Sequence, residues 1–127
     1  MNQVCPEQPV LIVDDEASWL KSLSLLLERA FDLTHIKTCQ DSRQVMALLE
    51  QKSASLVLLD MTMPVMSGVE TFGHLRQIAP HVPVLFLSGL NEPEELHQHI
   101  GQKGTDFLKK PFRLDQLIKK MEGVMVA

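Results

Sequence analysis

Three short runs of uninterrupted apolar residues limit what this chain can fold into more than any other feature. They are Val10–Val13, Leu56–Leu59 and Val84–Leu87. A strand that is apolar at every position is typical of one buried on both faces, as in a parallel sheet covered by helices. Weaker patterns predict two more strands, at Leu33–Thr38 and Thr105–Lys109.

Segments with apolar residues at helical spacing follow each predicted strand. The expected helices lie at residues 19–30, 45–49, 69–78, 92–100 and 114–121. Ser18 is placed to cap the first helix, and Asp41 or Ser42 to cap the second. Five strand–helix units in alternation predict an α/β fold, with a parallel sheet, helices on both faces and right-handed crossovers.

The composition is that of an ordinary globular domain. The length of 127 residues suits one domain, and the chain is 45% hydrophobic and 22% charged. The apolar runs are too short to cross a bilayer, and the N-terminus lacks the basic start and apolar core of a signal peptide. We therefore expect a cytoplasmic protein with no membrane contact, whose single domain has its core at residues 8–125 after a flexible tail at residues 1–7.

Charge and cysteine usage argue against two kinds of site. The net charge is −4, and acids interleave with the basic residues near the C-terminus. Nucleic-acid binding usually needs a clustered basic face, so we expect no direct nucleic-acid contact. Cys5 and Cys39 form no metal-type or redox pair, and we expect both to be free thiols.

Polar residues follow four of the predicted strands. Asp14–Glu16 come after the first strand, Asp60 after the third, Ser88 after the fourth and Lys110 after the fifth. The carboxyl ends of parallel strands meet at one edge of the sheet, where ligands bind in such folds. We therefore expect these acids, the hydroxyl and the amine to converge on one cleft.

A cluster of carboxylates is costly unless a cation neutralises it. Mg²⁺ prefers oxygen ligands and keeps several waters, so Asp15, Asp60 and a nearby backbone carbonyl would suit it. Lys110 could pair with one carboxylate and later with an incoming anion. A carboxylate beside a metal and an amine can also attack phosphorus, and Ser88 could then bond to the added oxygens.

Four motifs in order, VLIVDDE, LVLLDMTMPVMSG, VPVLFLSG and FLKKPF, resemble the receiver domain of two-component response regulators. The resemblance covers residues 8–125. It implies a single-domain, flavodoxin-like α/β sandwich, doubly wound, with a five-stranded parallel sheet of order 2-1-3-4-5. It also implies a phosphoacceptor domain that is not an enzyme in its own right, although it takes part in its own phosphorylation and dephosphorylation.

The resemblance further assigns roles to residues of the acidic cluster. Asp60 would accept the phosphoryl group from a sensor histidine kinase or a phosphotransfer protein. Asp14 and Asp15 would bind Mg²⁺ together with Asp60, and the backbone carbonyl of Thr62 would complete the protein ligands.

The resemblance assigns a second set of residues to signalling. Lys110 and Ser88 would contact the phosphoryl group, and Phe107 matches an aromatic switch that rotates inward on activation. The face made by the fourth helix, fifth strand and fifth helix would report the state to an output domain or partner protein, and the family allows a homodimer through it. The Lys110–Pro111 bond is often cis in this family.

Other interpretations share parts of the pattern. Asp14 and Asp15 alone are also typical of acids at a helix start, and Phe107 of a core aromatic. A dehalogenase-type phosphatase would need an acid at Thr62, and a flavodoxin-like cofactor carrier would not place Asp14–Glu16 against a phosphate. A receiver that is not phosphorylated would lack some of the site residues. The pattern fits a stand-alone receiver and the receiver fragment of a transcriptional regulator or a hybrid kinase equally.

Overall fold

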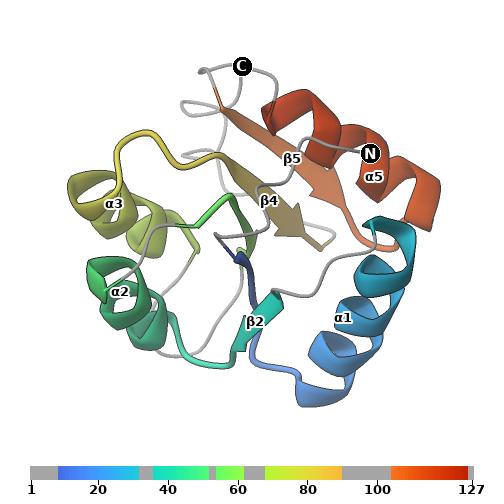
Figure 1. Ribbon diagram of the computed structural model, residues 1–127, viewed down its shortest axis with the longest axis horizontal. Coiled ribbons are helices and arrows are strands. Elements are labelled where there is room, and N and C mark those ends of the chain that lie inside the picture. Colours follow the sequence, from blue (N-terminus) through green and yellow to red (C-terminus); the bar gives the residue numbers. More distant parts are fainter. Residues whose placement is uncertain (1–8, 32–35, 52–53, 62–67, 90–103, 126–127) are drawn as a thin grey trace.

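One five-stranded parallel sheet organises the molecule, in the order β2-β1-β3-β4-β5 (Figure 1). The computed structural model describes residues 9–31, 36–51, 54–61, 68–89 and 104–125. The strands are β1 (Val10–Val13), β2 (Ile36–Cys39), β3 (Leu56–Asp60), β4 (Val84–Ser88) and β5 (Thr105–Lys109). The predicted strand order and the flavodoxin-like α/β class are confirmed.

Helices cover both faces of this sheet. They are α1 (Ala17–Phe31), α2 (Ser42–Gln51), α3 (Gly68–Ile78) and α5 (Leu114–Met125). Figure 1 shows α2 and α3 on one side of the sheet, with α1 and α5 on the other. The helix expected at residues 92–100 lies outside the described residues. None of the described helices has the length and apolar character that a membrane crossing needs.

The apolar strands supply a core layer to each face of the sheet. In β1, Leu11 and Val13 pack with α2 and α3, whereas Val10 and Ile12 pack with α1 and α5. All four side chains are at most 1% exposed. Burying one such side chain contributes about 1.5–3 kcal/mol, so an uninterrupted apolar strand is stable only in this two-sided setting.

Strand register brings the strand ends to one edge of the sheet. Val13 lies beside Leu59, so the residues that follow Val13 stand level with Asp60 at the end of β3. Asp60 pairs with Leu87, and Ser88 pairs with Lys109. The parallel sheet therefore places the polar residue that ends or follows each of these strands at the same edge, as the sequence predicts.

Two local predictions differ from the structure. The second strand ends at Cys39 rather than Thr38, and its predicted start at Leu33 lies outside the described residues. Ser18 does not cap α1, because the helix begins at Ala17 and the Leu20 amide already donates to the Glu16 carbonyl at 3.1 Å. The Glu16 amide donates to Asp14 Oδ1 at 3.1 Å, which turns the chain early and starts the helix sooner.

The cap of α2 follows the prediction. The Arg43 amide donates to Asp41 Oδ1 at 2.9 Å, and the Gln44 amide donates to the Asp41 carbonyl at 2.9 Å. Asp41 is therefore the N-cap, the position where a short acidic side chain satisfies an otherwise unpaired helix amide.

Candidate functional site

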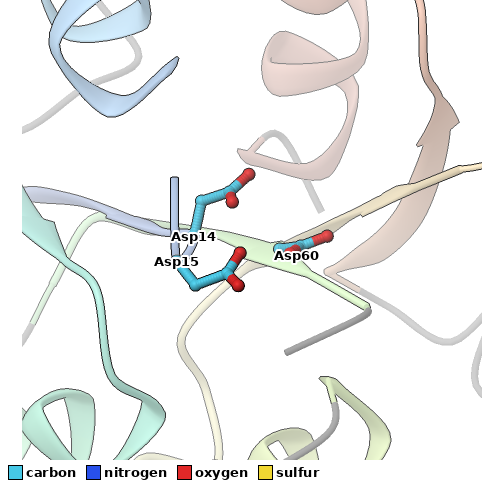
Figure 2. Close-up of side chains that lie close together, drawn as sticks. All are labelled: Asp14, Asp15 and Asp60. Atoms are coloured by element: carbon cyan, nitrogen blue, oxygen red, sulfur yellow. The ribbon is translucent and has the colours of Figure 1, made fainter. Parts of the chain in front are cut away.

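Three carboxylates meet at the carboxyl edge of the sheet. Oxygens of Asp14, Asp15 and Asp60 all lie within 4.8 Å of one another. Figure 2 shows Asp14 and Asp15 side by side after β1, and Asp60 beside them at the end of β3. Asp14 and Asp60 are buried, at 2% and 6% exposed, whereas Asp15 is open to solvent. The cluster thus has two fixed inner acids and one outer acid that a small cation can reach.

Asp14 is held at both side-chain oxygens and at its backbone. Its amide donates to the Cys39 carbonyl at 3.0 Å, which extends the pairing of β1 with β2 by one residue. Oδ1 accepts the Glu16 amide, and Oδ2 accepts the Lys110 ammonium at 2.9 Å. These bonds give partners to a buried polar side chain that would be costly to bury without them.

Lys110 is the cation that faces this cluster. Its Nζ lies 2.9 Å from Asp14 Oδ2 and 3.6 Å from Asp60 Oδ1. Its amide donates to the Ser88 carbonyl at 2.6 Å, and the bond to Pro111 is cis, as the resemblance implied. The pairing of β5 with β4 therefore places the Lys110 amine beside the carboxylates at this edge of the sheet.

The balance of charge in this group of four favours a divalent cation. Three carboxylates against one ammonium leave 3 − 1 = 2 negative charges among Asp14, Asp15, Asp60 and Lys110. Closely spaced carboxylates repel one another, and carboxylate oxygens are the ligands that hard cations such as Mg²⁺ prefer. The donor set therefore fits a divalent metal bound by oxygen.

Ser88 carries an unsatisfied hydroxyl next to this cluster. The residue is 0% exposed, and its Oγ has no hydrogen-bond partner among the residues that the structure describes. A buried hydroxyl without a partner costs about 1–3 kcal/mol, so such groups are uncommon outside functional sites. Its place at the end of β4, one strand from Asp60, suits a donor to an oxygen-bearing group added there.

The remaining predicted site residues fall into two groups. Phe107 is half-buried and packs against the core cluster of α2 and α3, beside Phe86 on β4. That position suits a core aromatic and a switch equally, so the switch role stays a prediction. Thr62 lies outside the described residues.

Sequence reasoning missed one neighbour of the site, Trp19. Its ring centre lies 5.4 Å from the Lys110 Nζ. The available signal was its position four residues after Asp15, in the first turn of α1.

Comparisons with known proteins agree with this geometry. The family model of the response regulator receiver domain matches residues 10–122. Protein RcaC of Microchaete diplosiphon is 35% identical over 122 residues, covering 91% of this chain and 18% of that protein. Response regulator MprA of Mycolicibacterium vanbaalenii is 28% identical over 116 residues, covering 91% and 49%.

Solved structures show the same likeness. The chemotaxis protein CheY4 of Vibrio cholerae superposes with a TM-score of 0.78 at 29% identity, covering 92% of this chain and 98% of that one. The curated relatives are longer, and this chain spans about half the length of those such as MprA.

Proposed function

This chain belongs to the response regulator receiver domain family of two-component signalling, and from that premise we propose that Asp60 is its phosphoacceptor. The observation that carries the proposal is the cluster of Asp14, Asp15 and Asp60 within 4.8 Å, faced by the Lys110 ammonium. The phosphatase and the flavodoxin-like cofactor carrier weighed from the sequence are set aside, because the family match covers residues 10–122.

Asp14, Asp15 and Asp60 would hold Mg²⁺, with the Thr62 carbonyl as a further ligand. The metal, when bound, would neutralise the carboxylates and draw charge from the phosphoryl oxygens. The Asp60 carboxylate oxygen would form a bond to phosphorus while the bond from phosphorus to the donor breaks and the donor keeps the electron pair. Aspartyl phosphate is the product, and the donor would be a phosphohistidine of a kinase or phosphotransfer protein.

Two further residues would stabilise the phosphorylated state. Lys110, already 3.6 Å from Asp60, would pair with a phosphoryl oxygen. The Ser88 hydroxyl, which has no partner among the described residues, would donate to another phosphoryl oxygen and so gain a hydrogen bond in its buried position. Movement of Ser88 would make room for Phe107 to turn inward, and the face that contains β5 and α5 would thereby change shape.

The whole protein's partners follow from the family by analogy. We propose that the protein is cytoplasmic. Its phosphoryl source would be a sensor histidine kinase or phosphotransfer protein, and its target an output domain or separate protein. The receiver unit would occupy residues 8–125. A homodimer through the face made by β5, α5 and the helix expected at residues 92–100 is also proposed, and sedimentation with and without phosphorylation would test it.

Intact-mass measurement after incubation with acetyl phosphate and Mg²⁺ tests the phosphoacceptor. The wild-type chain should gain one phosphoryl group, and Asp60→Asn should gain none. Asp115→Asn is a matched control, because it removes an exposed carboxylate that is paired with Arg113 away from the cluster. A wild type that stays unmodified, as a receiver that is not phosphorylated would, or an undiminished adduct on Asp60→Asn, contradicts the proposal.

A further inference from the structure

Trp19 stands against the amine of the candidate site. It lies in the first turn of α1 and is partly buried, with its ring packed edge-on to Phe112 at a centroid distance of 5.6 Å and an angle of 68°. Phe112 follows Lys110 by two residues. The two rings therefore tie the start of α1 to the turn that carries the lysine.

The Lys110 ammonium contacts two kinds of partner, carboxylates and an aromatic ring. Asp14 and Asp60 attract it by charge, at 2.9 and 3.6 Å. The Trp19 ring, 5.4 Å away, attracts it through the negative face of the π system, and Trp is the best of the side chains at this. Lysine carries its ammonium at the end of a flexible four-carbon chain, so a second contact, with the ring face, restricts the positions that the ammonium can occupy.

Packing alone does not account for an indole at this place. The Trp19 Nε1 is buried and has no acceptor within the described part of the chain. A leucine or phenylalanine would fill apolar space without leaving a buried N–H group unpaired. The property that distinguishes an indole from those side chains, apart from this unpaired donor, is its strong attraction for a cation on the ring face.

We propose that Trp19 is a positioning residue, which holds the Lys110 ammonium against Asp14 and Asp60 and so sets how fast Asp60 is phosphorylated. The inference rests on the proposed function, because it acts through the amine assigned to the phosphoryl group. It adds a residue of α1 to a site otherwise built from the ends of strands.

Labelling rates of Trp19 variants test this role. With acetyl phosphate and saturating Mg²⁺, Trp19→Leu should slow formation of the adduct by roughly threefold to tenfold, as expected for loss of one cation–π contact. Trp19→Phe keeps an aromatic face and should recover most of the rate. An unchanged rate for Trp19→Leu overturns the inference.

A double-mutant cycle separates positioning from support of the fold. In a Lys110→Met background, Trp19→Leu should slow labelling no further, because the contact through which it acts is already gone. Equal slowing in both backgrounds would mean that Trp19 supports the fold and not the amine.

A matched control comes from the opposite face of the sheet. Phe72 packs edge-on to Phe86 at 5.1 Å and 63°, and the Arg76 guanidinium lies 4.8 Å from the Phe72 ring centre. Phe72→Leu thus removes a similar ring pair and cation contact away from the acidic cluster. It should lower the melting temperature and leave the labelling rate unchanged, whereas a loss as large as that of Trp19→Leu overturns the inference.

Fluorescence gives a readout that does not need phosphorylation. Trp19 is the single tryptophan of the chain, which has no tyrosine, so emission reports on this ring alone. Lys110→Met should shift the emission. Arg43→Met should not, because it removes a cation from α2, which lies on the opposite side of the sheet from α1 (Figure 1). Identical emission from wild type and Lys110→Met contradicts the contact. An unlabelled wild type refutes the proposed function instead, and leaves the emission result to decide this inference.

Discussion

Two aspartate–cation pairs in this molecule have similar distances and different consequences. Asp14 and Lys110 meet at 2.9 Å, with side chains 4% and 30% exposed, and are 96 residues apart in sequence. Asp41 and Arg43 meet at 2.6 Å, with side chains 28% and 67% exposed and two residues apart. Distance does not separate the two pairs; burial and neighbouring charge do.

The neighbours explain the difference. The Asp41–Arg43 pair is local and balanced, and the Asp41 carboxylate also caps α2. The Asp14–Lys110 pair lies beside Asp15 and Asp60, so this group has three carboxylates and one ammonium. The first arrangement completes a helix end, whereas the second holds an excess of negative charge that a metal ion would relieve.

Removal of each cation tests this contrast most strongly. Lys110→Met leaves buried acids without their ammonium, and we expect the free energy of unfolding to fall by about 3 kcal/mol in metal-free buffer. Added Mg²⁺ should restore much of that loss, because the ion replaces the missing positive charge. Urea unfolding with and without Mg²⁺ measures both effects.

Arg43→Met is the control for that experiment. Exposed ion pairs contribute little to stability, so its unfolding curve should match that of the wild type within error, with or without Mg²⁺. Equal losses from Lys110→Met and Arg43→Met would show that burial does not distinguish the pairs.

A smaller effect on the free energy of unfolding is expected from Cys39. This residue ends β2, its thiol is free and buried, and its backbone carbonyl accepts the Asp14 amide. Burial raises the pKa of Cys39 from 9.0 to about 11. A raised pKa means stability that is present below pH 9 and is lost as pH rises through 11. The loss should be about 1–2 kcal/mol over that range.

Comparison with Cys39→Ala isolates this loss. Urea unfolding between pH 8 and 11 should give a shallower decline for Cys39→Ala than for wild type, because the lysines and the other cysteine titrate in both proteins. Parallel pH profiles would place the Cys39 thiol in water rather than in the core.

The smallest effect belongs to Asp41. A side-chain hydrogen bond from Arg43, together with its backbone amide, lowers the pKa of Asp41 from 3.8 to about 2. A lowered pKa means stability that is present above pH 4 and is lost as pH falls through 2. Arg43→Gln should move the pKa of Asp41 back toward 3.8 in an NMR titration, with little change in unfolding at pH 7. An unmoved pKa would assign the shift to the helix end alone.

Sequence reasoning predicted the parts of the fold that burial determines. β1 is apolar throughout, and β3 and β4 are apolar up to their last residues, Asp60 and Ser88, so the positions of these strands follow from the need to bury both faces. β2 mixes exposed and buried residues, and its end depends on the pairing of Cys39 with Val13, a contact that its own sequence does not encode. The start of α1 was misplaced for a similar reason, because the Asp14 side chain turns the chain before Ser18.

The candidate site also has parts that the sequence predicts and parts that it does not. Asp14, Asp60, Ser88 and Lys110 could be predicted together, because parallel strands bring their carboxyl ends to one edge. Which carboxylate Lys110 approaches most closely could not be predicted, nor could its contact with Trp19. Both depend on side-chain packing between segments far apart in sequence, for which strand periodicity carries no signal.

The Mg²⁺ dependence of phosphoryl labelling tests the central claim, that the excess of carboxylates forms a metal-dependent phosphoacceptor site. Labelling of the wild type by acetyl phosphate should require Mg²⁺ and saturate with it. Asp15→Asn removes the outer acid and leaves Asp60 and Lys110 in place. This variant should need at least about tenfold more Mg²⁺. Wild-type labelling that is independent of Mg²⁺, or an identical Mg²⁺ requirement in Asp15→Asn, would contradict the claim.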